Sequence, residues 1–179
     1  YKGGLPTAPL SQTGSSSTTG TECYFRPSIH TFENIQFSYD ILVRRLRELA
    51  FLNSGVTIRL LDERSGKKEE FYFEGGLKAF VAYINLNKTT LNAIFHCESY
   101  REDGIGVEVA MEWNDGFQEQ VFAYTNNITQ GDGGTHVAGF RSALTRSLNT
   151  YIERENLSKG DQIQTTGDDA REGLSAVIS

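Results

Sequence analysis

The sequence has no long apolar run, no closely spaced cysteines and no surplus of positive charge. No stretch approaches the roughly 20 apolar residues of a membrane-spanning helix, so we expect no membrane segment. The two cysteines, Cys23 and Cys97, form no CxxC pair, which argues against a redox motif or a zinc site and favours reduced thiols in a cytoplasmic protein. The net charge of −6 argues against a surface coated with nucleic acid, although a local basic patch is compatible with it.

The chain also lacks an initiator methionine and a signal peptide. It opens on Tyr1 and closes on Ser179, just after a short apolar run at residues 176–178 that is typical of a strand. We therefore expect both ends to lie inside a larger protein, which would itself have carried any signal peptide. A function inferred from these residues would then belong to that parent.

The first part of the chain predicts little regular structure. Residues 1–20 are rich in Gly, Pro, Ser and Thr, which is typical of a flexible connection. Residues 21–25 favour a short strand that stops at Pro27. Ser38 is a candidate cap for a helix that runs to about Leu52. We expect the lone strand to complete a sheet whose other strands lie outside this sequence.

The rest of the chain alternates between strand pairs and helices. Two hairpins are expected, 56–62 with 69–73 and 105–112 with 118–124, the second joined by the turn at residues 114–116. Three helices are expected: one over residues 77–84, one capped by Thr135 and one capped by Asp168 or Asp169. These elements indicate an α+β fold with mixed or antiparallel sheets and helices packed on one face.

Three groups of residues could suggest a site but have simpler explanations. Gly133-Gly134 before a helix could form an anion nest, yet such a pair is usually a tight turn. His136 has no nucleophile or carboxylate at a persuasive spacing, so we expect no acid–base role. Acids at Asp168 and Asp169 are explained by helix capping and the helix dipole. We predict no catalytic residue and no metal ligand in this chain.

Several motifs follow one another in a fixed order over nearly the whole chain. They include Gly3-Gly4-Leu5-Pro6, residues 47–56 (RELAFLNSGV), Glu74-Gly75-Gly76, Asn126-Asn127-Ile128, Gly133-Gly134-Thr135-His136 and residues 167–174 (GDDAREGL). Together they resemble the B subunits of bacterial type II topoisomerases, in the gyrase branch more than in the topoisomerase IV branch. The resemblance implies that residues 1–53 are the C-terminal part of a GHKL ATP-binding domain. It implies that residues 54–179 are a transducer domain with a ribosomal-protein-like α+β fold.

The resemblance also implies a function for the parent. It would be an ATP-hydrolysing type II topoisomerase that couples ATP to clamp closure, DNA duplex passage and negative supercoiling. ATP and Mg²⁺ would be cofactors of the intact subunit, and the phosphate-contacting lysine loop of the transducer would lie beyond residue 179. We therefore expect this piece alone to be inactive. The implied partners are a DNA duplex of any sequence, the gyrase A subunit and a second B subunit.

Two residues of the expected first strand match the family's adenine pocket. Thr21 matches a threonine that reaches the adenine and its bound water, a task that suits a hydroxyl because it both donates and accepts hydrogen bonds. Cys23 would point the same way at a period of two and line the apolar side of the pocket, where the family usually has an aliphatic residue. The alternative is that both merely pack in a strand, because Thr and Cys are ordinary strand residues.

Arg141 is the candidate residue for DNA. At about 100° per residue it lies about 40° from Val137, at the edge of the apolar face, whereas Arg146 lies at about 180°, on the solvent side. An arginine at the edge of an apolar face extends its charged end into solvent, forms a salt bridge or has a designated partner. Arg141 matches an arginine that lines the family's DNA cavity, where it would attract phosphates without reading sequence. We expect no such role for Arg146.

Other functions stay open. Folds like that of the transducer also occur in RNA-binding and translation proteins, so the chain could be a non-enzymatic nucleic-acid-binding or scaffold module. The acidic charge and the lack of a basic, aromatic-studded sheet argue against RNA recognition. Relatives within the ATPase superfamily, such as a topoisomerase IV B subunit, a mismatch-repair protein or a chaperone, are the other alternative.

Overall fold

The computed structural model describes residues 1–155, 157 and 165–179. The chain divides into two compact units, Tyr1–Tyr39 and Asp40–Ser179. The expected domain boundary between residues 53 and 54 stays a prediction. Among the described residues, no helix is long and apolar enough to cross a lipid bilayer.

The first unit contains almost no regular structure. The structure describes all of residues 1–38 and assigns them no helix or strand beyond an isolated bridge between Lys2 and Leu5. The predicted strand at residues 21–25 is therefore wrong, and Thr21 and Cys23 are exposed coil residues. The physical reason is that a strand must pair its backbone N–H and C=O groups, and this unit offers no partner strand.

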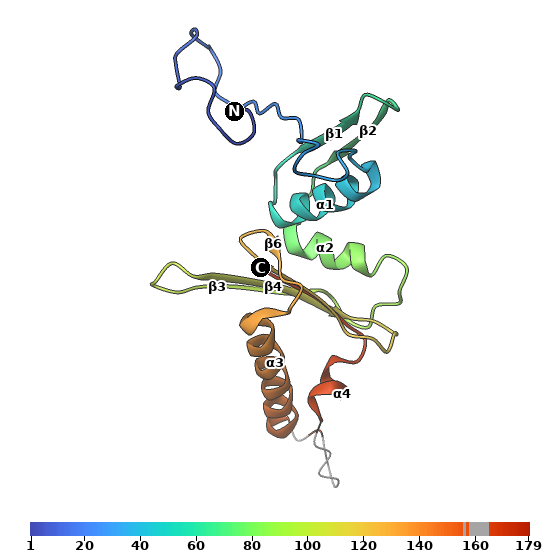
Figure 1. The fold of residues 1–179 in the computed structure, drawn as a ribbon. Coiled ribbons are helices and arrows are strands. Elements are labelled where there is room, and N and C mark those ends of the chain that lie inside the picture. The colour runs from blue at the N-terminus through green and yellow to red at the C-terminus, as the bar shows by residue number, and fades with distance from the viewer. Residues whose placement is uncertain (156, 158–164) are drawn as a thin grey trace. The chain divides into compact units, whose positions relative to one another are not determined.

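The second unit opens with a helix, a hairpin and a second helix (Figure 1). These are α1 (Tyr39–Leu52), β1 (Ile58–Asp62), β2 (Lys67–Phe71) and α2 (Gly76–Ile84). All four were predicted, although β1 starts two residues later than expected and β2 lies two residues earlier at both ends. The Asn53 side chain ends α1 by donating to the Leu49 carbonyl at 2.7 Å, which satisfies one of the carbonyls left free at a helix C-terminus.

The remaining strands form one sheet. They are β3 (Phe95–Tyr100), β4 (Gly106–Trp113), β5 (Gln120–Thr125), β6 (Ile128–Thr129) and β7 (Leu174–Ile178), in the order β3-β4-β7-β5-β6. The predicted pairing of 105–112 with 118–124 is wrong, because β7 lies between β4 and β5. It runs antiparallel to β4 and parallel to β5.

Burial explains why β7 takes the central position. Every residue of β7 is buried, so its backbone needs hydrogen-bond partners along both edges. The turn after β4 is present, with the Asn114 side chain accepting from the Gly116 N–H at 2.9 Å, but it leads the chain away from β4. Gly173 precedes β7 with φ 71°, and a Cβ there would lie 2.3 Å from the Asn114 carbonyl oxygen. Only glycine therefore fits where β7 enters the sheet.

Helices cover both faces of this sheet (Figure 1). Val177 of β7 packs in the cluster that contains Phe80 of α2, whereas its neighbour Ala176 packs with Leu144 of α3 (Gly134–Arg154). The α+β class and the mixed sheet are confirmed, but the expectation of helices on one face is wrong. Alternate residues of a strand point to opposite faces, and the central strands are apolar on both.

Two predicted helix caps are also wrong. The N-cap of α3 is Gly133 at φ 81°, a left-handed conformation that suits glycine better than Thr135. The short helix α4 (Gly167–Arg171) is capped by Thr166, whose hydroxyl accepts from the Asp169 N–H at 3.2 Å. The Asp169 carboxylate accepts from the Thr166 N–H at 2.9 Å in return. This reciprocal pair is a capping box, so the acid is its third helical residue rather than the cap.

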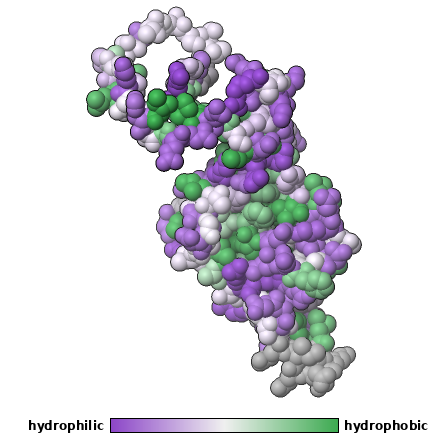
Figure 2. All heavy atoms as spheres, turned by 45° about the vertical axis from the view of Figure 1, so that its right-hand side comes forward, coloured by the Kyte–Doolittle hydropathy of each residue, from purple (hydrophilic) through white to green (hydrophobic). Residues whose placement is uncertain are grey.

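An aromatic stack joins α1 to the sheet. Phe51 is 2% exposed. The centroid of its ring lies 3.8 Å from that of Phe73 and 4.9 Å from that of Phe80. The same cluster includes Tyr124 of β5 and Val177 of β7. The helix that opens the second unit is thus part of its main core. Beyond this core, the face drawn in Figure 2 carries mostly hydrophilic side chains with apolar ones gathered between them.

A buried polar network ties α2 to the central strands. Asn85, directly after α2, donates to the Glu112 carboxylate at 2.8 Å and accepts from the Ser175 hydroxyl at 2.7 Å. Asn114 donates to Ser175 at 3.2 Å and to Asn85 at 3.3 Å. All four residues are buried, so each bond satisfies a group that would otherwise be costly to remove from water.

We expect Phe51→Ala to lower the free energy of unfolding by about 3–5 kcal/mol, because it leaves a cavity inside the aromatic stack. Denaturant unfolding followed by circular dichroism measures the change. Ile41→Ala on the same helix is the control, since Ile41 is 66% exposed and its loss should cost within about 0.5 kcal/mol. Equal losses for the two variants would contradict the packing described here.

We expect Arg64→Ala to raise the pKa of Asp62 toward its ordinary value of 3.8. Hydrogen bonds from the Arg64 side chain, at 2.8 and 2.9 Å, lower the pKa of Asp62 to about 2. A carboxyl with a lowered pKa stabilises the fold above pH 3.8 and loses that contribution as the pH falls toward 2. Carboxyl NMR titration measures the pKa of Asp62. The control Arg59→Ala breaks another ion pair of this hairpin and should leave that pKa unchanged.

Candidate functional site

Helix α3 carries the candidate site of the second unit. Val137 and Leu144 of this helix are buried against the sheet, as its apolar periodicity predicted. Arg141, Arg146 and Arg154 lie outside the buried stripe, on exposed positions. The helix therefore presents three guanidinium groups on a chain whose net charge is negative.

Arg141 forms an ion pair with Glu119, which lies just before β5. Its Nε donates to Oε1 of Glu119 at 2.9 Å and its Nη2 donates to Oε2 at 3.0 Å. The Arg141 side chain is 45% exposed and that of Glu119 is 23% exposed. Two parallel bonds of this kind fix the guanidinium in one orientation more firmly than a single contact would. The salt bridge was one of the outcomes that the sequence left open for Arg141.

A second arginine shares the same carboxylate. Nε of Arg171, at the end of α4, lies 3.3 Å from Oε1 of Glu119, and its Nη2 donates to Asp168 at 2.8 Å. The Arg171 side chain is only 14% exposed, and its Nε is buried without a hydrogen-bond partner among the described residues. Glu119 therefore lies between two guanidinium groups from two different helices.

Sequence reasoning missed Glu119 and Arg171 as members of this cluster. The spacing of Asp168 and Arg171, three residues apart on one helix, was a signal that could have paired those two. No local signal connects Glu119 to either arginine, because the three residues come from separate elements. Only the tertiary structure brings them together.

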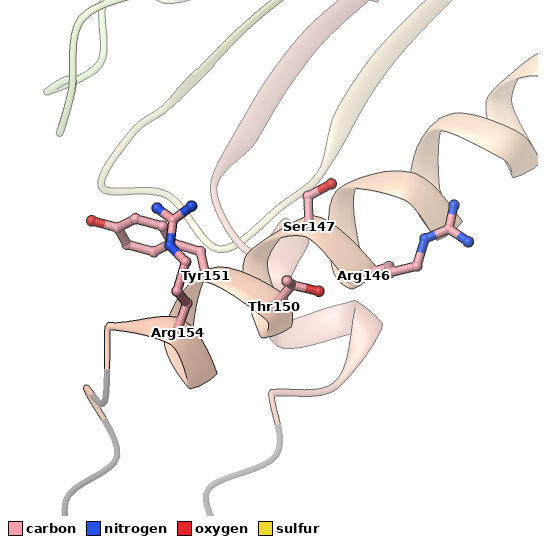
Figure 3. Close-up of a pocket in the computed structure, with 5 residues that line it drawn as sticks. All are labelled: Arg146, Ser147, Thr150, Tyr151 and Arg154. Carbon is pink, nitrogen blue, oxygen red and sulfur yellow. The ribbon is translucent and has the colours of Figure 1, made fainter.

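A shallow hollow lies further along the exposed side of α3 (Figure 3). It is lined by Arg146, Ser147, Thr150, Tyr151 and Arg154. The Arg154 guanidinium lies 5.5 Å from the centre of the Tyr151 ring, and its Nε pairs with Glu155 at 3.0 Å. Figure 3 shows Arg146 pointing away from this arginine–tyrosine pair. Guanidinium and hydroxyl groups of this kind are common donors to phosphate oxygens.

Tyr124 and His136 are two further polar side chains of the second unit. Burial raises the pKa of the Tyr124 hydroxyl, and the nearby charge of Glu48 raises it further, so this hydroxyl stays protonated at neutral pH. Nε2 of His136 is buried without a hydrogen-bond partner among the described residues. Within the same part of the chain, no three His, Cys, Asp or Glu side chains group closely enough to hold a metal ion.

Thr21 and Cys23, the two residues matched to the adenine pocket, are exposed in the structure. Both lie in exposed coil of the first unit, so the strand geometry that would point them the same way is not formed. The Cys23 thiol is free. The proposed contact of Thr21 and Cys23 with adenine stays a prediction.

The chain is similar to known proteins along its whole length. The family model of DNA gyrase B matches residues 76–179. The DNA gyrase B subunit of Myxococcus xanthus is 44% identical over 179 residues, covering 100% of this chain and 22% of that protein. The DNA gyrase B subunit of Chlamydia pneumoniae is 46% identical over 185 residues, covering 100% of this chain and 23% of that protein.

The fold is similar to a solved structure as well. The 43K ATPase domain of Thermus thermophilus gyrase B, in complex with an aminocoumarin, superimposes with a TM-score of 0.74 and 34% identity. The match covers 86% of this chain and 42% of that one. The chain spans less than a quarter of the length of the two gyrase B subunits above. The resemblance drawn from the sequence motifs is confirmed, in the gyrase branch rather than the topoisomerase IV branch. The chain belongs to the DNA gyrase B family.

Proposed function

We propose that this chain forms part of an ATP-dependent gyrase B subunit and relays ATP binding and hydrolysis to clamp closure and DNA duplex passage. The observation that carries the proposal is the sequence identity with gyrase B subunits over the whole chain. The parent would be an ATP-hydrolysing type II topoisomerase that introduces negative supercoils in the cytoplasm. Its partners would be a DNA duplex, the gyrase A subunit and a second B subunit.

The packing of α1 supports a relay through the second unit, whose residues 54–179 would form the transducer. Arg45 of α1 donates to the Asn127 carbonyl at 2.5 Å and to the Thr129 hydroxyl at 3.2 Å. Asn127 donates in turn to the Asn53 side chain at 3.1 Å. Together with the Phe51 stack, these bonds connect α1 to the β5–β6 turn and to the sheet core. A displacement of α1 would therefore carry the sheet with it, because packed cores move as bodies rather than deform continuously.

Residues 1–53 would complete the ATP-binding domain of the parent. We place Thr21 and Cys23 at the adenine end of its nucleotide pocket, with Thr21 exchanging hydrogen bonds and Cys23 supplying an apolar wall. Their exposure in this chain is compatible with a pocket that needs further residues. ATP and Mg²⁺ would bind only in the intact subunit.

Arg141 would face the transported duplex. Its guanidinium is partly exposed at the edge of α3. Contacts of this kind attract phosphates without reading bases, which suits an enzyme that passes duplexes of any sequence.

We expect Arg141→Gln to weaken binding of a short duplex to the chain and to reduce the slope of log K against log salt by about one. Fluorescence anisotropy of a labelled duplex at several salt concentrations measures both. Arg59→Gln is the matched control, because Arg59 is also an exposed arginine paired with a glutamate, on the β1–β2 hairpin. If both variants behave alike, Arg141 is not a DNA contact.

We expect Thr21→Val in the intact subunit to raise the KM for ATP by roughly three- to tenfold, the cost of one lost hydrogen bond. A phosphate-release assay with Mg²⁺ measures it, with Thr19→Val as a neighbouring control that should leave KM unchanged. The 179-residue chain alone should release no phosphate in the same assay. Turnover by the chain at the rate of the intact subunit would overturn the division of residues proposed here.

A further inference from the structure

The three-residue cluster of Arg141, Glu119 and Arg171 is asymmetric. Arg171 is largely buried, with 14% of its side chain exposed, whereas Arg141 is 45% exposed and faces solvent. Glu119, at 23% exposure, lies between them. The buried arginine therefore anchors the carboxylate from the inside, and the exposed arginine meets it from the outside.

The cluster holds more donors than acceptors. Both oxygens of Glu119 accept from Arg141, and the buried Nε of Arg171, 3.3 Å from Oε1 of Glu119, has no hydrogen-bond partner among the described residues. Each guanidinium carries five N–H donors, so the two arginines together carry more donors than the roughly four lone-pair sites of one carboxylate can accept. A phosphodiester of DNA presents two non-bridging oxygens, like a carboxylate, in a geometry that the guanidinium matches equally well. A phosphate can therefore compete with the Glu119 carboxylate for the guanidinium of Arg141.

The acidic surroundings decide where a phosphate could enter. Asp168, Asp169 and Glu172 line a hollow together with Glu119 and Arg171. Their charges would repel a phosphate from the Arg171 side. Arg141 does not line that hollow, so it is the arginine of the pair that a DNA phosphate can reach.

We propose that Glu119 is a positioning residue that holds Arg141 against the protein, and that a phosphate of duplex DNA competes with its carboxylate for the Arg141 guanidinium. The inference rests on the proposed function, because it takes Arg141 to be a DNA contact. Arg171 keeps Glu119 in place when Arg141 is released. DNA binding at this position then replaces the Arg141–Glu119 ion pair with an Arg141–phosphate ion pair, rather than adding an ion pair.

Glu119→Gln tests the exchange, because it removes the charge and keeps the shape of the side chain. Duplex affinity at low salt should rise roughly fivefold, the factor set by loss of a competing surface ion pair. The slope of log K against log salt should also steepen. Glu70→Gln is the matched control: it removes the same charge from another exposed arginine pair, so it reports the effect of net charge alone.

The double variant Glu119→Gln with Arg141→Gln separates positioning from general electrostatics. The gain in affinity should vanish in the double variant, since no Arg141 guanidinium is left to release. If Glu119→Gln does not fold, as judged by circular dichroism, Glu119→Asp serves instead. Its shorter side chain cannot span both arginines at the same distances, so a smaller gain in affinity is expected.

The outcomes distinguish two failures. If Arg141→Gln binds the duplex like Arg59→Gln, the DNA role of Arg141 fails and this inference fails with it. If Arg141→Gln weakens binding but Glu119→Gln binds no more tightly than Glu70→Gln, or if its gain persists in the double variant, only the positioning role of Glu119 is wrong.

Discussion

The burial of β7 between β4 and β5 is the constraint on which the rest of the second unit depends. All five residues of Leu174–Ile178 are buried, so both edges of the strand must be hydrogen-bonded and both faces must be covered. Its one polar side chain, Ser175, is satisfied by Asn85 and Asn114. Placing this strand centrally forces β4 and β5 apart, although they are neighbours in sequence.

Covering both faces of β7 determines where the helices lie. One face takes α2 and, through the Phe51 stack, α1; the other face takes α3. The two layers are linked through the same strand, so α1 and α3 belong to one packed body. This arrangement gives a physical basis for the proposed relay, in which a displacement of α1 would move α3 on the opposite face of the sheet.

The arginines of α3 and α4 lie in a chain whose net charge is negative. Arg141 and Arg171 are matched by Glu119 and Asp168, and Arg154 by Glu155. An arginine that is already paired contributes less attraction to DNA than a free one, since binding must first replace its partner. Under the proposed function, contact with a passing duplex requires attraction weak enough to release it, and acidic partners within the chain would limit that attraction.

The sequence by itself determined the elements whose signal is local. Helical periodicity located α1, α2 and α3, alternation located β4, and the ordered motifs identified the gyrase B family. Only the tertiary structure decided that β7 separates β4 from β5, that residues 21–25 form no strand in this chain, and that Glu119 lies between two arginines. The reason is common to all three. A local pattern specifies which face of an element is apolar, but strand partners and ion partners are contacts between residues far apart in sequence.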